Sequence, residues 1–128
     1  MESIKDFNFK IIAVDFDGTL VDDQYPNIGA INIPLAKALL ELKKLGHKIV
    51  LWTCRSGEQL KSAVEFCEFN GIIFDSVNKN IPEVLKIYPE DTRKVYADIY
   101  IDDKAFLHYF SLGEIDNTDY ILNRVLSR

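Results

Sequence analysis

The most constraining feature of this chain is a short apolar run that ends on two carboxylates. Residues 11–14 read Ile-Ile-Ala-Val, and Asp15, Asp17 and Gly18 follow almost directly. An apolar run of this length between charged residues is typical of a strand buried on both faces, as in a parallel sheet. We therefore expect Asp15 and Asp17 at the carboxyl end of that strand, where ligands bind in open α/β sheets. Two crowded carboxylates repel each other, and a divalent cation relieves that repulsion.

Three further apolar runs predict the rest of the sheet. They lie at residues 49–52, 72–77 and 97–101, and segments with the apolar spacing of amphipathic helices separate the first three runs of the chain. Strands that alternate with helices favour an α/β fold in which helices cover a parallel sheet.

Turn and cap residues predict where the helices begin and end. The first helix is expected over residues 34–46, because proline suits a first helical position and glycine suits the residue after the last turn. Asn80 is expected to cap a short helix that reaches about Tyr88. Either Asn117 or Thr118 is expected to cap a last helix, whose inner face would carry Ile121, Leu122, Val125 and Leu126.

The chain of 128 residues is expected to form one domain over residues 1–128. Residues 20–33 interrupt the regular pattern, because turn-forming residues such as Pro26 and Gly29 gather there. We expect a loop or small hairpin over the mouth of the site, since long loops in compact domains tend to be functional. The alternative is a surface connection that only packs against its neighbours.

Charge and composition limit the partners. The net charge is −5 and no basic run exceeds two residues, which argues against a nucleic-acid partner. A phosphorylated substrate, small or macromolecular, is still compatible, because a metal, a lysine and backbone amides can hold phosphate locally. The apolar runs are too short for a membrane span and the first residues are polar, so we expect no membrane association and a cytoplasmic protein. Cys54 and Cys67 are expected to be buried free thiols.

Polar residues also follow two later strands of the predicted sheet. Thr53 and Arg55 come after the second strand, and Asp102 and Asp103 come after the last one. Carboxylate attack on phosphorus needs a cation against the phosphoryl oxygens, hydrogen-bond donors around them, and an acid for the leaving group. Together with the aspartates of the first strand and a lysine, these residues match that requirement.

The motifs Asp15-Phe16-Asp17-Gly18-Thr19, Thr53 and Asp102-Asp103, in this order, resemble those of the haloacid dehalogenase (HAD) superfamily of aspartate-nucleophile phosphatases. The resemblance spans residues 11 to about 105. It implies the Rossmann-like core of that superfamily, which is a three-layer, doubly wound parallel sheet.

The resemblance also implies roles for individual residues. Asp15 would form an aspartyl-phosphate, while Asp17 would protonate the leaving group and then activate water. Thr53 would hydrogen-bond the phosphate, and the backbone around Gly18 is a further candidate phosphate contact.

The same resemblance implies Mg²⁺ as the cofactor. Asp15, the backbone carbonyl of Asp17 and Asp102 would hold the ion. Asp103 would be a second ligand through water, or would orient its neighbour.

The basic residues of the site are less constrained. Lys79 follows a predicted strand and is expected on the same sheet edge as the aspartates. Lys94 precedes its strand and would reach the site only by a loop back, although short members of the superfamily carry a lysine close before their last aspartates. Lys104 is expected to be solvated. Arg55 is expected either to bind a substrate anion or to pair with a carboxylate of the 20–33 loop.

Too few residues separate Thr19 from Thr53, or Thr53 from Lys79, to hold the cap domain that many superfamily members insert. The leading hypothesis is therefore a capless Mg²⁺-dependent phosphomonoester hydrolase, whose open site is compatible with a homodimer. The alternative is a catalytically silent phosphate- or metal-binding regulatory module of the same fold. Dehalogenation is disfavoured by the second carboxylate, and a nucleic-acid 3′-phosphatase by the missing basic groove.

Overall fold

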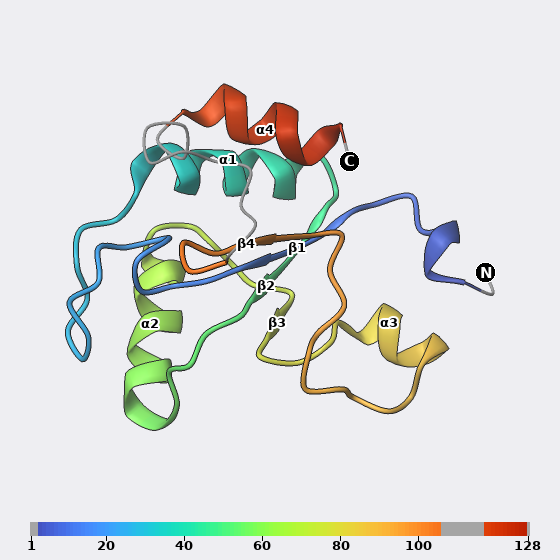
Figure 1. The fold of residues 1–128 in the computed structure, drawn as a ribbon, viewed down its shortest axis with the longest axis horizontal. Helices are drawn as coiled ribbons and strands as arrows, with labels where there is room; N and C mark the ends of the chain where they lie inside the picture. Colours follow the sequence, from blue (N-terminus) through green and yellow to red (C-terminus); the bar gives the residue numbers. More distant parts are fainter. Residues whose placement is uncertain (1–2, 106–116, 128) are drawn as a thin grey trace.

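The structure is a computed structural model that describes residues 3–105 and 117–127. Its centre is a parallel sheet with the strand order β3-β2-β1-β4 (Figure 1). The strands are β1 (Ile11–Val14), β2 (Lys48–Leu51), β3 (Ser76–Val77) and β4 (Ile99–Ile101). The chain moves outward from β1 to β3 and then returns to the far side of β1, so the strand order reverses between β1 and β4. In open α/β sheets, ligands bind at the carboxyl ends of the strands beside such a reversal.

Helices cover both faces of the sheet, as predicted. They are α1 (Ile33–Lys44), α2 (Gly57–Phe69), α3 (Pro82–Ile87) and α4 (Thr118–Leu126), and a single 3₁₀ turn spans Ile4–Asp6. Figure 1 shows α1 and α4 side by side on one face, with α3 on the opposite face.

The burial pattern of β1 explains the layers. Every residue of β1 is buried, and successive side chains point to opposite faces. Ile12 and Val14 belong to a core that includes residues of α1, α2 and α4, whereas Ile11 and Ala13 pack with Val84 of α3. The result is the predicted three-layer, doubly wound α/β fold.

Two predicted strands are longer in the sequence pattern than in the structure. The run 72–77 pairs as a strand only at β3, because the amide of Ile72 still closes the last turn of α2 by donating to the carbonyl of Cys67. The run 97–101 begins its ladder at Ile99. Just before it, the carboxylate of Asp98 accepts the amide of Ile11 at 2.7 Å in place of a backbone partner.

The cap predictions had different outcomes. Asn117 caps α4, as predicted, because its side chain accepts the amide of Tyr120 at 2.9 Å. Asn80 does not cap α3. It is buried and accepts the amide of Tyr96 at 2.6 Å, so it ties the start of α3 to the segment before β4. Leu126 was expected on the inner face of α4 but is 43% exposed.

Residues 20–32 form a narrow closed loop between β1 and α1. Val21 and Ile31 make an antiparallel bridge, and the amide of Asp22 donates to the carbonyl of Ala30 at 2.9 Å. Leu20 and Val21 are buried and anchor the base of the loop in the core. In the described chain neither this connection nor the one between β2 and α2 contains a further domain, as predicted for a capless core.

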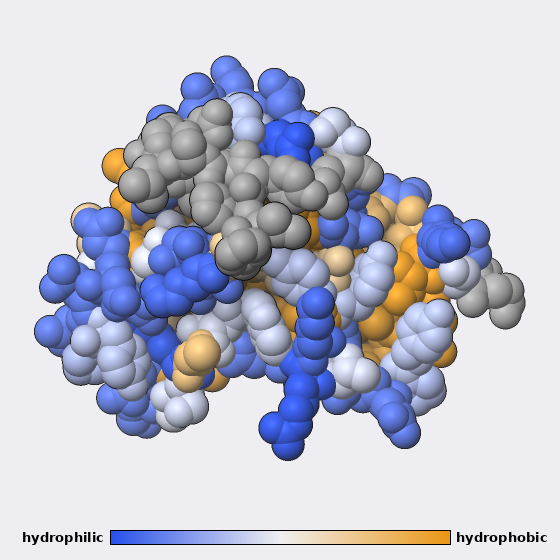
Figure 2. Space-filling view, viewed as in Figure 1, coloured by the Kyte–Doolittle hydropathy of each residue, from blue (hydrophilic) through white to orange (hydrophobic). Residues whose placement is uncertain are grey.

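The surface seen in Figure 2 is mostly hydrophilic, with an apolar area between the N-terminal segment and α3. Ile4, Phe7 and Phe9 pack there against the smaller core cluster of the sheet. None of the helices in the described ranges has the length and apolar character needed to cross a bilayer.

Candidate active site

Three carboxylates meet where β1 and β4 end. Asp15 follows β1, and Asp102 and Asp103 follow β4; one oxygen of each lies within 4.8 Å of the others. The two strand ends are held together because the amide of Asp15 donates to the carbonyl of Ile101 at 2.9 Å. Three of the sequence-predicted metal ligands are therefore neighbours.

Thr19 links these carboxylates, and the sequence reasoning did not single it out as a site residue. Its buried hydroxyl accepts the amide of Asp103 at 3.0 Å. The single hydroxyl hydrogen can be donated to Asp103 at 2.8 Å or to Asp15 at 3.2 Å. Its position directly after Gly18 could have indicated this role, since a turn at that glycine brings the next side chain back toward the end of β1.

Gly18 is required by close packing and by its backbone conformation. Its φ is +86°, and a Cβ at this position would lie 2.7 Å from Oδ2 of Asp103. Its amide donates to the carbonyl of Val21 at 2.8 Å. Since that amide is used inside the turn, the predicted phosphate contact of Gly18 would need this hydrogen bond to open.

Burial, neighbouring charge and hydrogen bonds shift the pKa values of Asp15 and Asp103 in opposite directions. Burial, followed by repulsion from Asp102, raises the pKa of Asp15 to about 7. Burial alone would also raise the pKa of Asp103, but hydrogen bonds from Thr19 and Lys104 outweigh it and hold that pKa below its usual value. Lys104, although largely exposed, pairs with Asp103 at 3.3 Å.

This donor set fits a small hard cation. Mg²⁺ prefers carboxylate oxygens, and ligands on opposite sides of the ion lie about 4 Å apart, a spacing compatible with this cluster. A bound cation would also offset the repulsion from Asp102 that, after burial, raises the pKa of Asp15.

Asp17 points to a different partner. Its two carboxylate oxygens accept a pair of hydrogen bonds from Arg55, at 2.7 Å from Nε and 2.8 Å from Nη2. The side chain of Arg55 is only 1% exposed, so this is a buried bidentate ion pair. The side chain of Asp17 is not part of the carboxylate cluster.

Arg55 uses all five of its N–H groups inside the protein. Besides the two bonds to Asp17, it donates to the carbonyls of Asn27 at 2.7 Å, Gln59 at 3.2 Å and Pro26 at 3.3 Å. Of the two predicted roles, binding a substrate anion would need one of these bonds to open. The other anticipated a carboxylate of the 20–33 loop; the structure instead has backbone carbonyls of that loop and the carboxylate of Asp17.

Thr53 follows β2 as predicted, and the segment that follows β3 holds its backbone. Its amide donates to Oδ1 of Asn78 at 2.8 Å, and its hydroxyl oxygen accepts the amide of Arg55 at 3.1 Å. The hydroxyl hydrogen can then be directed toward a ligand. Asn78, which has a φ of 55°, is a second residue that sequence reasoning missed.

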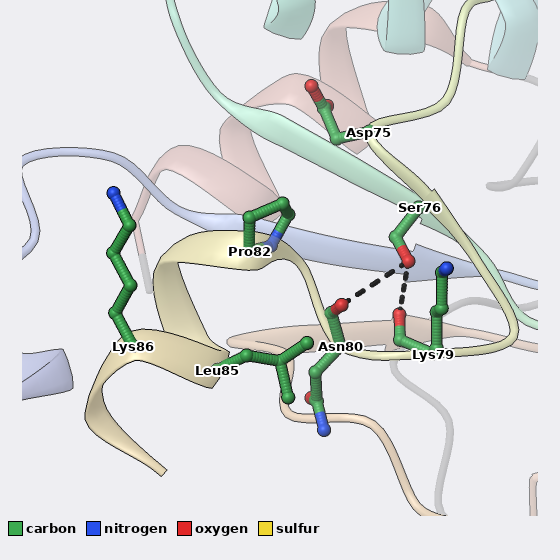
Figure 3. Close-up of a pocket in the computed structure, with 7 residues that line it drawn as sticks. All are labelled: Asp75, Ser76, Lys79, Asn80, Pro82, Leu85 and Lys86. Atoms are coloured by element: carbon green, nitrogen blue, oxygen red, sulfur yellow. Dashed lines mark hydrogen bonds between the residues drawn. The ribbon is translucent and has the colours of Figure 1, made fainter. Parts of the chain in front are cut away.

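The two candidate lysines lie in different places. Lys79 is exposed and lines a cavity of about 510 Å³ beside β3 and α3, where Figure 3 shows the hydroxyl of Ser76 directed at the carbonyls of Lys79 and Asn80. Lys94 is exposed too, with its Nζ 5.2 Å from the ring centre of Tyr100. Across residues 3–105 and 117–127 neither lysine has an ion pair with a carboxylate. A contact of Lys79 or Lys94 with the phosphate of a substrate therefore stays a prediction.

The prediction that both cysteines are buried free thiols was correct for Cys67 and wrong about the burial of Cys54. Cys67 is buried, and burial raises the pKa of its thiol to about 12. Cys54, between Thr53 and Arg55, is exposed. Both are free thiols.

Comparison with known proteins identifies the family. Residues 12–123 match the model for haloacid dehalogenase-like hydrolases, so this chain belongs to that family of hydrolases. It is also similar to a solved structure described as a conserved protein coded by a locus from Bacteroides thetaiotaomicron. The two share 36% sequence identity with a TM-score of 0.75, over 91% of this chain and 93% of the other. No curated protein matches the sequence.

Proposed function

We propose that this protein is a Mg²⁺-dependent phosphomonoester hydrolase that acts through an aspartyl-phosphate. The observation that carries the proposal is the meeting of the Asp15, Asp102 and Asp103 oxygens within 4.8 Å at the strand ends. Asp17 on the same turn supplies a second carboxylate for proton transfer. Membership in a hydrolase family supports this assignment.

The reaction would proceed in two balanced steps. In the first, an oxygen of ionised Asp15 bonds to phosphorus and the phosphorus–oxygen ester bond breaks. The leaving oxygen takes the proton of Asp17, which has to enter this step as the carboxylic acid and leaves it as the carboxylate. In the second, water gives a proton to Asp17 and its oxygen bonds to phosphorus. The phosphorus–oxygen bond to Asp15 then breaks, which releases phosphate and restores the carboxylate of Asp15 and the carboxylic acid of Asp17.

The surrounding residues would bind and orient the phosphoryl group. Asp15, Asp102 and the backbone carbonyl of Asp17 would hold Mg²⁺, with Asp103 beside them. When bound, the ion supplies positive charge against the phosphoryl oxygens. The hydroxyl of Thr53 would donate to one of those oxygens, and Lys79 or Lys94 would contribute a cation if the bound substrate draws it in.

The site has a loop where larger relatives have a cap. The 20–32 loop contacts Arg55 through its backbone, which supports a role for this loop in covering the substrate. A phosphoryl group on a large molecule, or a small substrate closed in by the loop, fits such a site. A cytoplasmic location and a homodimer remain predictions from the sequence.

Hydrolysis of 4-nitrophenyl phosphate with and without Mg²⁺ tests the proposal. Asp15→Asn keeps the size of the side chain but removes the nucleophilic charge, and it also removes the repulsion within the cluster, so the variant is expected to fold. We expect magnesium-dependent turnover in the wild type and in Asp119→Asn, a matched change at an exposed position of α4, and none in Asp15→Asn.

Two results would contradict the proposal. Turnover that survives in Asp15→Asn would exclude this nucleophile. A wild type that binds Mg²⁺ or phosphate but hydrolyses no phosphomonoester would favour the alternative, a silent binding module of the same fold.

A further inference from the structure

The side chain of Arg55 joins three separate parts of the protein. It contacts Asp17 on the turn after β1, the carbonyl of Gln59 in α2, and the carbonyls of Pro26 and Asn27 in the 20–32 loop. The guanidinium is planar, and all of its N–H groups are used, so its orientation is fixed in every direction within that plane.

Two aromatic rings also contact the same guanidinium. Its central carbon lies 4.9 Å from the ring centre of Phe16 and 5.1 Å from that of Tyr25. Phe16 is buried in the core, whereas Tyr25 is in the loop and 57% exposed. A movement of the loop would therefore shift three contacts of Arg55 at once, namely the carbonyls of Pro26 and Asn27 and the ring of Tyr25.

The bidentate pair passes this orientation on to Asp17. Two parallel hydrogen bonds fix the plane of a carboxylate as well as its position, which a lysine at the same place could not do. Each oxygen of Asp17 still has a second lone pair that can face the reacting groups, and one of these would carry the proton that passes to the leaving oxygen.

We propose that Arg55 is a positioning residue that fixes the carboxylate of Asp17 for proton transfer and makes this orientation depend on the 20–32 loop. This inference rests on the proposed phosphatase function and deepens it. The loop would then have part of the function of a cap domain, because its closure over a substrate would also orient Asp17, the acid for the leaving group.

The role has a signature that a purely structural residue lacks. Protonation matters most when the leaving oxygen is strongly basic, and a well-placed general acid contributes about 10²- to 10⁴-fold to such reactions. Loss of positioning should therefore slow phenyl phosphate, whose leaving group is basic, far more than 4-nitrophenyl phosphate, whose leaving group departs as a stable anion.

The test compares kcat/KM for these two substrates in Arg55→Lys, which keeps the positive charge but loses the two parallel N–H donors that bind Asp17. The matched control is Arg93→Lys, which lies in an exposed stretch before β4. We expect Arg55→Lys to lose at least about tenfold more activity on phenyl phosphate than on 4-nitrophenyl phosphate, and Arg93→Lys to lose neither. An equal loss on both substrates would overturn the positioning role.

The dependence on the loop is tested by a second variant in which two glycines replace residues 23–28. This change removes both carbonyl acceptors and leaves Arg55 and Asp17 in place, so the variant does not depend on the folding of Arg55→Lys. We expect the same selective loss on phenyl phosphate, and no selectivity would overturn the link to the loop.

Hydrogen exchange gives a readout that does not depend on catalysis. The amides of Asp22 and Asn27 are hydrogen-bonded within the loop, and both should exchange faster in Arg55→Lys than in Arg93→Lys. Unchanged exchange would overturn the tether. If the wild type hydrolyses neither substrate, the proposed function fails and the proton-transfer role fails with it, while hydrogen exchange still decides whether Arg55 holds the loop.

Discussion

Replacing Thr19 with valine tests how the carboxylate cluster is held together. Valine keeps the shape of the buried side chain, but the amide of Asp103 loses its acceptor at 3.0 Å and the Asp103 carboxylate loses a donor at 2.8 Å. Each unpaired group costs about 1–3 kcal/mol when buried. Because Asp103 is exposed and water recovers part of this, we expect the metal-free protein to lose about 1–2 kcal/mol of unfolding free energy.

The effect on metal binding should be larger and more specific. Residues that orient metal ligands typically contribute 10- to 100-fold in affinity, so Thr19→Val should weaken Mg²⁺ binding by about that factor. Thr19→Ser keeps the hydroxyl and should bind Mg²⁺ within about threefold of the wild type, although it loses about 1 kcal/mol of stability with the buried methyl group.

Titration calorimetry with Mg²⁺ and urea unfolding without metal measure the two effects separately. If Thr19→Val binds Mg²⁺ as tightly as the wild type, the Thr19 hydroxyl does not orient the metal ligands. The same conclusion holds if serine and valine weaken Mg²⁺ binding by the same factor, since the hydroxyl would then not be the cause.

Two further predictions concern groups away from the carboxylates. Burial, followed by the charge of Lys10, lowers the pKa of His47, whose Nδ1 accepts the amide of Lys10 at 2.8 Å. The unfolded chain therefore binds the proton more readily, so the contribution of His47 is present above about pH 6.5 and is lost as the pH falls toward the lower folded pKa. Relative to His47→Asn, which keeps an acceptor, the wild type should lose stability in urea unfolding between pH 7 and 5; a constant difference would exclude this. For the cysteines, a thiol reagent should modify Cys54 rapidly in the native protein and Cys67 only after unfolding, as peptide mass mapping would show; rapid labelling of Cys67 would contradict its burial.

The positions of the site residues could largely be predicted from the sequence. Apolar runs that stop at Asp15, Thr53 and Asp102 predict strand ends, and in a parallel sheet these ends must share one edge. That prediction needs only the order of strands and helices along the chain. The meeting of Asp15 with Asp102 and Asp103 follows from it once β4 pairs with β1.

Side-chain partners could not be predicted in the same way. The pairing of Arg55 with Asp17 depends on how the chain turns after β2, and nothing in the local sequence distinguishes a substrate anion from a carboxylate of the protein. Asn80 looked like a helix cap because it precedes Ile81-Pro82, but tertiary contacts with Asp91 and Tyr96 take its side chain instead. Local patterns predict which residues end an element, whereas partners distant in sequence are set by the packed fold.

The brevity of β3 has a consequence for how molecules of this protein meet. An edge strand exposes unpaired backbone groups that can join the sheet of another molecule, and natural proteins limit this hazard by keeping such strands short. β3 pairs over only two residues, so it offers a poor template for a second chain. This matters because Ile73, just before that edge, and Phe69 at the end of α2 are 54% and 91% exposed. Exposed apolar side chains next to a long, regular edge strand would favour aggregation. Because β3 pairs over only two residues, the exposed Phe69 and Ile73 do not lie beside such an edge.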